Sequence, residues 1–500
     1  MRLCLAALMM FVCCTTVYTK FSYTSINCLY IAPPYTIECG TLTVPESRQS
    51  DSGSIQLAVV IIRSSAEHPA PDPVVYLAGG PGGSSTAYTE GLAYTWLRPF
   101  LERRDVILVD QRGTGASTPG LACDEYSYMI LDQISRVSSA LQTIQDQAEA
   151  LQACQERLTR EGVLTSAYTS AESAADLEDL RLALTIESWN LLGVSYGTRL
   201  ALTVLRDYPQ GVRSVILDSV YPPQVNLFVD AYANGERARK AVFKACAENI
   251  QCAAAYPDLE SRFWQLVASL NDKPETVSIQ LSRGTHDFVW TGNRLYGLVF
   301  QWLYDHHDIS FIPYYIDLLW QGKFDDMLLL RAALQAELSG LGISMGLYMS
   351  VQCGEERPVT LAEARDTLLQ TYPRLTSLLN YDLWLSEAGD TNCRAWQPDA
   401  PSPIENQPVT SDVPALLLSG VYDPITPPAW AALAAETLTQ GQTIVVPGVG
   451  HGAIRSSNCV AQMAAVYLDA PTQPVNAICL LNNAPLSFYV PRAQSETGGL

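Results

Sequence analysis

The chain has 500 residues, of which 48% are apolar, so it can bury a large core and is not a single small module. Its formal net charge of −20 argues against a nucleic-acid partner, because phosphates require a basic face. The acidic balance favours cationic ligands such as the free amino terminus of a peptide, although solubility alone is an equally simple explanation.

Residues 1–21 have the pattern of a signal peptide. Arg2 precedes an apolar stretch that runs from Leu3 to about Val17, and small and polar residues follow it. This pattern predicts cleavage and export. No later segment reaches the roughly 18 apolar residues of a membrane span, so we expect no stable span after cleavage. The alternative is a protein anchored to the cell envelope by this N-terminal segment, for example through a lipid on Cys13 or Cys14.

The next part of the chain, residues 22–220, alternates between strand and helix patterns. Two β-runs, "YTIECGTLTVP" and "SIQLAVVIIRS", predict an opening hairpin. Four short apolar runs follow, "PVVYLAGG", "RDVILVD", "WNLLGVS" and "VRSVILDS", and they are typical of strands buried on both faces. Helix-like segments such as "TSAESAADLEDLRLAL" lie between them. The alternation predicts an α/β fold, with a mostly parallel sheet and helices on both faces.

The alternation stops after residue 220. Residues 221–408 are rich in Tyr and Trp and carry long helical patterns, which predict an inserted, mainly helical cap. We expect a smaller insertion, roughly residues 121–162, to extend this cap. The runs "VPALLLSG" and "QTIVVPGVG" then resume the strand pattern, so residues 409–500 are predicted to return to the core.

The sequence "GVSYG" places Ser195 where a strand pattern changes into a helix pattern. A short GxSxG match arises often by chance, and a serine is a useful nucleophile only beside a base that a third group orients. In the chain order serine, acid, histidine, His451 is the one histidine that follows the last strand run. Asp423 follows the preceding run and is the predicted acid, with Asp218 as the competitor. The alternative is that all are turn residues.

The glycine-rich segment "YLAGGPGGSS" follows an early strand run. Its backbone N–H groups are suited to stabilise a developing oxyanion. We predict Gly80 as one donor and Tyr196, which follows the nucleophile, as the other, with Gly82 and Gly83 as alternatives to Gly80. Pro81 has no N–H. A phosphate loop is excluded because the GK[ST] ending is missing.

Ten cysteines remain after the signal peptide, an even number typical of an exported protein. Pairing neighbours in chain order predicts five disulfide bonds, each contributing about 3 kcal/mol; they join Cys28 to Cys39, Cys123 to Cys154, Cys246 to Cys252, Cys353 to Cys393, and Cys459 to Cys479. The alternatives are free buried thiols or metal ligands. No CxxC occurs and histidines are few, so no metal and no organic cofactor is expected.

The motifs together resemble the α/β-hydrolase serine exopeptidases, specifically secreted tripeptidyl aminopeptidases and proline iminopeptidases. The segments that carry the resemblance are "GGPGGSS", "VDQRGTGAS", "GVSYGTRLAL", "LDSVYPP" and "SGVYDPITPP…GVGHGAIRSSNCV…ICL". The resemblance implies an α/β-hydrolase fold and a secreted serine aminopeptidase that acts on peptides with a free amino terminus, in tripeptidyl- or prolyl-type release. Ala78 stands where the family often has a histidine before the glycines. Activity is expected to survive, because the oxyanion donors are backbone groups.

The same family uses carboxylates of the cap to hold the substrate's ammonium group. By this resemblance, Glu355 and Glu356 in "VQCGEERP" are predicted to bind the substrate's amino terminus, singly or together; the alternative is a solvated acidic turn. Two other functions are open. One is a carboxylesterase or lipase on the same framework. The other is a non-catalytic, hydrolase-like binding protein, for which a broken triad would be expected.

Overall fold

A computed structural model of the chain describes residues 21–28, 34–50, 53–89, 95–281, 284–356, 361–378, 389–399, 402–482 and 486–491. Except for Phe21, the predicted signal peptide lies outside these residues. Within the described ranges, no helix combines the length and the apolar character that crossing a membrane requires.

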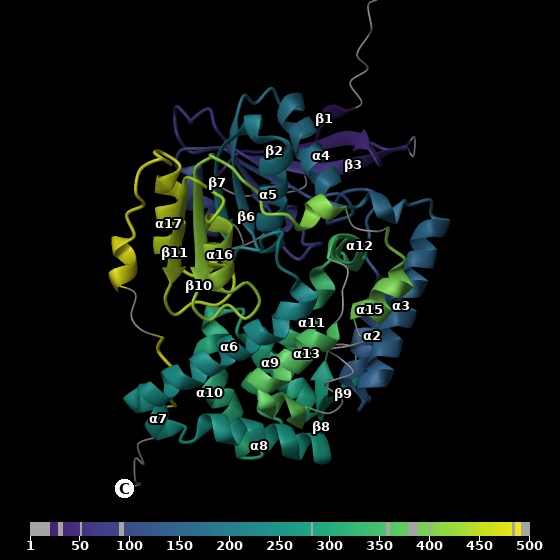
Figure 1. Cartoon of the computed structure of the whole chain (residues 1–500), viewed down its shortest axis with the longest axis vertical. Helices are drawn as coiled ribbons and strands as arrows, with labels where there is room; N and C mark the ends of the chain where they lie inside the picture. Colours follow the sequence, from purple (N-terminus) through teal and green to yellow (C-terminus); the bar gives the residue numbers. More distant parts are fainter. Residues whose placement is uncertain are drawn as a thin grey trace, which may run out of the picture.

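A nine-stranded sheet forms the centre of the core (Figure 1). Its strands are β1 (Ser22–Ile26), β2 (Ile37–Pro45), β3 (Ser54–Ile62), β4 (Val74–Leu77), β5 (Val106–Val109), β6 (Trp189–Val194), β7 (Val212–Asp218), β10 (Ala415–Gly420) and β11 (Gly441–Val446). Their order across the sheet is β1-β2-β3-β5-β4-β6-β7-β10-β11. The first three strands pair antiparallel, as does β3 with β5, and all pairs from β5 to β11 are parallel.

Helices cover both faces of this sheet, because side chains alternate along each buried strand. On β6, Leu191 packs in one apolar cluster with α4 (Ser170–Ala183), α5 (Tyr196–Asp207) and α16 (Pro428–Ala435). Leu192 packs in the opposite cluster, with α1 (Arg98–Leu101) and α17 (Asn458–Tyr467). The predicted α/β architecture is therefore confirmed.

Nine other helices of the described residues form the main part of the cap. They are α6 (Leu227–Glu248), α7 (Ile250–Ala255), α8 (Leu259–Asp272), α9 (Gly292–Trp302), α10 (His306–Trp320), α11 (Met327–Leu338), α12 (Met345–Glu355), α13 (Leu361–Thr371) and α15 (Gly389–Trp396). A two-stranded hairpin, β8 (Glu275–Leu281) and β9 (Gly284–Trp290), lies among them. Most of these helices gather below the sheet, and α12 lies between them and the core (Figure 1). They enclose their own apolar cluster, built around Trp290 and Trp302.

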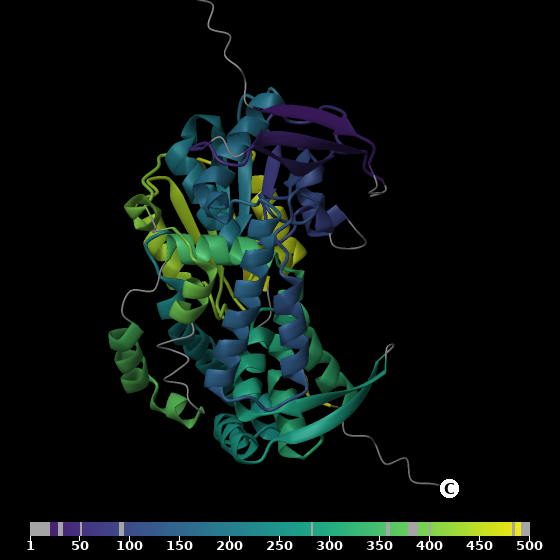
Figure 2. The same ribbon diagram turned by 90° about the vertical axis from the view of Figure 1, so that its right-hand side faces the viewer.

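Two further helices, α2 (Asp124–Ile134) and α3 (Ala140–Arg160), extend the cap from the segment that follows β5. They run side by side from the core toward the hairpin, as Figure 2 shows. Helix α3 packs against α15, and α2 contacts β9. The segment predicted as a smaller insertion thus connects the core to the cap through these two helices.

Local sequence explains where the longer helices begin. The Thr169 hydroxyl accepts a hydrogen bond from the N–H of Glu172 and so caps α4, and Asn226 caps α6 by accepting from Val229. Such side chains satisfy N–H groups that the first helical turn leaves without partners.

Five disulfide bonds join the cysteines in the pairs predicted from chain order. One joins β2 to the segment before it, one joins α2 to α3, one lies at the α6–α7 junction, one joins α12 to α15, and one joins α17 to the short helix that follows it. Bonds of this number are typical of proteins that fold in an oxidising compartment.

Candidate active site

Ser195 lies in a sharp turn between β6 and α5. Its backbone adopts φ 59° and ψ −126°, a conformation that side-chain-bearing residues rarely occupy and that persists only where the surroundings impose it. The two glycines of the motif make the turn possible. A Cβ added to Gly193 would lie 2.3 Å from the carbonyl oxygen of Gly197. A Cβ added to Gly197 would lie 2.0 Å from the carbonyl oxygen of Leu77.

The glycine-rich loop after β4, residues 78–83, lies directly against this serine. A Cβ on Gly79 would be 2.9 Å from the Cβ of Ser195. Gly80 has φ +111°, where glycine is favoured. Within the described chain, neither the N–H of Gly80 nor that of Tyr196 donates a hydrogen bond to a protein group. Tyr196 opens α5, whose first N–H groups have no partner inside the helix.

Other residues hold this glycine-rich loop in place. The Gln111 amide donates to the carbonyl of Ala78 at 3.0 Å, and the N–H of Ser344, just before α12, donates to the carbonyl of Gly82 at 2.9 Å. Gly82 is buried beneath that contact, whereas Gly80 is half-buried. Of the alternatives left open by the sequence, Gly80 is thus more accessible than Gly82.

Asp423 and His451 form a direct pair. The acid follows β10 and the histidine follows β11, and the distance from Asp423 Oδ2 to His451 Nδ1 is 2.9 Å. Asp423 also accepts hydrogen bonds from the N–H groups of Ile425 and Thr426. Burial alone would raise the pKa of Asp423, but the imidazole and these donors together hold it below its usual value. The carboxylate is therefore kept ionised beside the ring.

Thr426 contacts both members of this pair and was not predicted from the sequence. Its hydroxyl lies 2.8 Å from Asp423 Oδ2 and 3.2 Å from His451 Nδ1. The signal was present as Asp-Pro-Ile-Thr, in which an aspartate can cap the turn that carries a threonine three residues later.

Asp218, the competing acid, has a different role. Its carboxylate accepts hydrogen bonds from the N–H groups of Ala453 and Ile454, just after the histidine. Its own carbonyl accepts from the N–H of Ser195 at 2.9 Å. Asp218 thus joins the serine turn to the segment that follows His451. It is fully buried, and burial raises its pKa to about 6.

The structure therefore brings the three predicted triad residues to the same end of the parallel strands. The Asp423–His451 hydrogen bond is formed, and Asp218 links Ser195 to the histidine segment. Among the described residues, the Ser195 hydroxyl makes no hydrogen bond to the imidazole. Active-site hydrogen bonds of this kind are often long without substrate.

Glu355 and Glu356 lie at the end of α12 and are almost completely buried, with 1% and 2% exposure. Both pair with Arg199 on α5, at 3.1 Å and 3.0 Å. Glu355 also accepts from Ser170, and Glu356 accepts from the Tyr221 hydroxyl. Neither carboxylate is accessible to a substrate's ammonium group in this arrangement. Both carboxylates are held by protein groups, so the stretch is not a solvated acidic turn, and binding of an ammonium group by either one stays a prediction.

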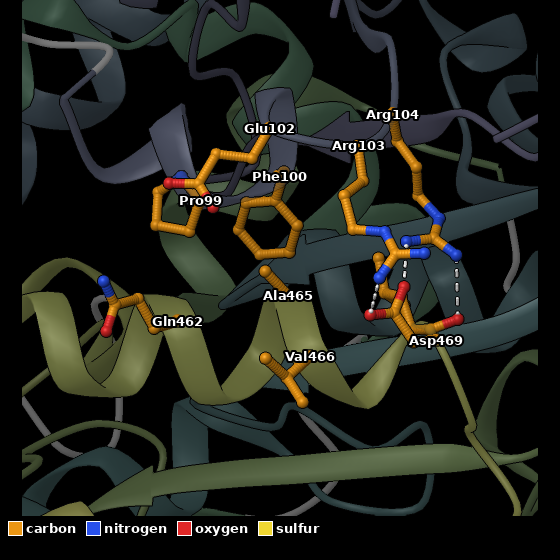
Figure 3. Close-up of a pocket in the computed structure, with 10 residues that line it drawn as sticks. Pro99, Phe100, Glu102, Arg103, Arg104, Gln462, Ala465, Val466 and Asp469 are labelled. Carbon is orange, nitrogen blue, oxygen red and sulfur yellow. Dashed lines mark hydrogen bonds and ion pairs between the residues drawn. The ribbon is translucent and has the colours of Figure 1, made fainter. Parts of the chain in front are cut away.

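A surface pocket lies elsewhere, between α1 and α17 (Figure 3). In it, Arg103 and Arg104 both pair with Asp469. None of the predicted site residues lines this pocket. The described residues also include no group of three or more His, Cys, Asp or Glu side chains arranged to hold a metal ion.

Two family models match the chain. One, described as the alpha/beta hydrolase fold, matches residues 72–243, and the other, described as TAP-like protein, matches residues 382–479. Serine protease Hip1 of Mycobacterium tuberculosis is 24% identical over 474 residues, which cover 87% of this chain and 86% of that protein. A tripeptidyl aminopeptidase of Streptomyces lividans is 29% identical over 38% of this chain and 36% of its own length. A proline iminopeptidase of Neisseria meningitidis serogroup B is 22% identical over 49% of this chain and 73% of its own length.

Proposed function

This chain belongs to the α/β hydrolases and carries a TAP-like C-terminal region, and from that premise we propose that it is an exported serine aminopeptidase. It cleaves peptide bonds near a free amino terminus, by tripeptidyl- or prolyl-type release. The observation that carries the proposal is the hydrogen bond between the buried Asp423 and His451, at the end of the sheet where the strained turn presents Ser195.

In the proposed reaction, the Ser195 hydroxyl attacks the carbonyl carbon of the scissile peptide bond. His451 takes the hydroxyl proton and later gives it to the leaving amine, while Asp423 holds the ring and stabilises the imidazolium. The N–H groups of Gly80 and Tyr196 donate to the tetrahedral oxyanion. The acyl-enzyme is then hydrolysed by a water molecule from which His451 removes a proton. Loss of one oxyanion donor typically lowers turnover by about 10²- to 10³-fold.

The choice of a peptide substrate is supported by the relatives, whose names are serine protease, tripeptidyl aminopeptidase and proline iminopeptidase. Export is supported by the five disulfide bonds and by the signal-peptide pattern of residues 1–21. Sequencing the amino terminus of the mature protein tests export. An intact Met1 would contradict cleavage.

The activity is tested with chromogenic aminoacyl, dipeptidyl and tripeptidyl amides, each with a free and with an acetylated amino terminus, and with a short-chain ester. We expect turnover of a free amide, at least about tenfold weaker kcat/KM after acetylation, and loss of about 10³-fold or more in kcat in Ser195→Ala. Ester turnover without amide turnover would indicate a carboxylesterase. The absence of both, with no labelling of Ser195 by a fluorophosphonate, would contradict serine hydrolase chemistry.

A further inference from the structure

The segment that carries the catalytic acid, residues 421–426 and here called the acid loop, is held by the cap as well as by the core. Two side chains of helix α6 reach it. Asn234 donates to the carbonyl of Ile425 at 3.0 Å. Arg237 lies one turn further along the helix, and its guanidinium donates to the carbonyls of Val421, at 2.8 Å, and Asp423. The backbone on both sides of the acid is therefore fixed from the cap.

The cap also holds the catalytic histidine. The N–H of His451 donates to the carbonyl of Tyr304, just beyond the end of α9, at 3.0 Å, and the two rings lie 4.8 Å apart. Gly450 approaches the same helix end so closely that an added Cβ would lie 2.0 Å from the carbonyl oxygen of Leu303. Both members of the Asp–His pair thus depend on cap elements for their position.

Arg237 is unusual among these contacts because its charge is not balanced by an ion pair. Its Nε is buried and has no hydrogen-bond partner. Within the described part of the chain, no carboxylate lies within 4.0 Å of its guanidinium. Burial lowers the pKa of Arg237. Two residues further on, Arg239 is buried and pairs with Glu236. A partly buried charge without a carboxylate partner reduces stability, so a purely structural role is a poor explanation for Arg237.

We infer that Arg237 is a positioning residue for the Asp423–His451 pair, an inference that rests on the proposed function. Its two donated hydrogen bonds fix the backbone of the acid loop, and so fix the direction of the Asp423 carboxylate. Its positive charge also interacts favourably with the Asp423 carboxylate, which favours the ionised form of the acid that holds the imidazole. The cap therefore forms part of the catalytic framework, in addition to covering the site.

Other groups around the histidine also bear on its titration. They are Asp423 in the acid loop, Asp218 at the end of β7, the phenol of Tyr304 beyond α9, and Arg455 in the short helix η9 (Ala453–Arg455). All four side chains are still present when Arg237 is replaced. A change in pH dependence that occurs in a variant without the charge, and not in a variant that keeps it, therefore reports the charge of Arg237.

Two substitutions separate the geometry from the charge. Arg237→Lys keeps the charge but loses the paired donors, and Arg237→Met loses both. The control is Lys244→Met, which removes a positive charge from the exposed side of the same helix, where Lys244 pairs with Glu248 at 3.7 Å. The substrate is the amide or ester that the wild type hydrolyses fastest, and kcat and KM are measured from pH 5 to 9.

We expect Arg237→Met to lower kcat by about 10- to 100-fold, with KM changed by less than about threefold. The acid limb of its kcat/KM profile moves to higher pH by a few tenths of a unit, roughly the effect of one nearby charge. Arg237→Lys loses about tenfold in kcat, but its acid limb stays in place. Lys244→Met behaves like the wild type.

A second readout does not need turnover. Spectra of protein labelled with ¹⁵N-histidine follow the ring of His451, assigned by His451→Gln. We expect its ring to become protonated at higher pH in Arg237→Met and at unchanged pH in Arg237→Lys. Wild-type kinetics and an unchanged titration in folded Arg237→Met would overturn the inference alone. An inactive wild type would overturn the proposed function, and the titration would still decide the role of Arg237.

Discussion

At the scale of single residues, Asp218 supports the candidate site without being one of the three proposed triad residues. It is fully buried, and its raised pKa of about 6 exceeds the ordinary value of an aspartate in an unfolded chain. The folded protein therefore binds more protons than the unfolded chain between about pH 4 and pH 6. The stability that Asp218 contributes is fully present below pH 4 and is lost as the pH rises through 6.

We therefore expect Asp218→Asn, which cannot ionise, to differ from the wild type in a pH-dependent way. The wild type exceeds the variant in free energy of unfolding by more at pH 4 than at pH 7, and the difference narrows by about 3 kcal/mol. Urea denaturation of both proteins at pH 4, 5.5 and 7, followed by circular dichroism, measures this gap. A gap that is constant, or that widens toward pH 7, would contradict the assignment.

Sequence predicted some of these residues and missed others for a physical reason. Ser195, Asp423 and His451 each follow an apolar strand run, and parallel strands bring their carboxyl ends to one edge of a sheet. Chain order therefore sufficed to propose them. Arg237 and Tyr304 reach the same place from cap helices whose packing angles no local pattern encodes. Their hydrogen bonds also involve backbone groups, since Arg237 donates to carbonyls of the acid loop and the Tyr304 carbonyl accepts from the N–H of His451, and backbone groups leave no residue-type signal.

At the scale of elements, a buried ionic cluster joins the helix of the nucleophile to the cap. Arg199 on α5 pairs with Glu355 and Glu356 at the end of α12, and all three are at most 2% exposed. Arg199 also donates to the carbonyl of Glu405 at 2.8 Å. Burial raises the pKa of both glutamates, and Arg199 opposes this. The cluster depends on the arginine to balance two carboxylates.

We expect Arg199→Met to lower the free energy of unfolding by about 3–5 kcal/mol, because it leaves both buried carboxylates without a cation. Arg206→Met, on the same helix but nearer to solvent, loses about 1 kcal/mol or less. Thermal and urea unfolding compare the two variants.

A separate prediction concerns Glu355. We expect Glu355→Gln to keep the preference for substrates with free over acetylated amino termini. A loss of that preference in the folded variant would restore the binding role predicted from sequence.

The elements that sequence predicted best are the buried ones. The core strands β4 to β7 and β10 are mainly apolar and almost entirely buried, so each showed as a short apolar run. Strand β1 is mostly exposed, and the β8–β9 hairpin lies inside a segment dominated by helices. Strand β1 gives no apolar alternation. Strand β8 does alternate, with Val277, Ile279 and Leu281 as its apolar positions, but the helical patterns on both sides of it dominated the prediction, and neither β1 nor the hairpin was predicted.

At the scale of the whole molecule, the cap and the core bury separate apolar clusters. The sheet has a cluster on each face, and the cap has a third, built from its helices and the β8–β9 hairpin. The change from alternating to helical patterns at about residue 220 was visible in the sequence. The return of residues 486–491 from the core to the cap was not, because six residues without a periodic pattern do not indicate where they pack.

These last described residues connect the end of the chain to the cap. Phe488 is 8% exposed and belongs to the apolar cluster of the cap. Tyr489 stacks on Phe311 of α10 with ring centres 4.5 Å apart, and its N–H donates to the carbonyl of Ser310 at 3.0 Å. The Tyr256 hydroxyl donates to the carbonyl of Tyr489 at 2.7 Å. The segment therefore packs against α10 of the cap.

We expect Phe488→Ala to destabilise the cap by about 3 kcal/mol, because it removes a buried ring and leaves a cavity. Hydrogen exchange measured by mass spectrometry should become faster in α10 and stay unchanged in β6 and β10, since local openings follow local packing. Tyr489→Phe is the matched control, because it keeps the stacked ring and the backbone hydrogen bonds. Equal acceleration in the core strands, or none in α10, would show that this segment does not hold the cap.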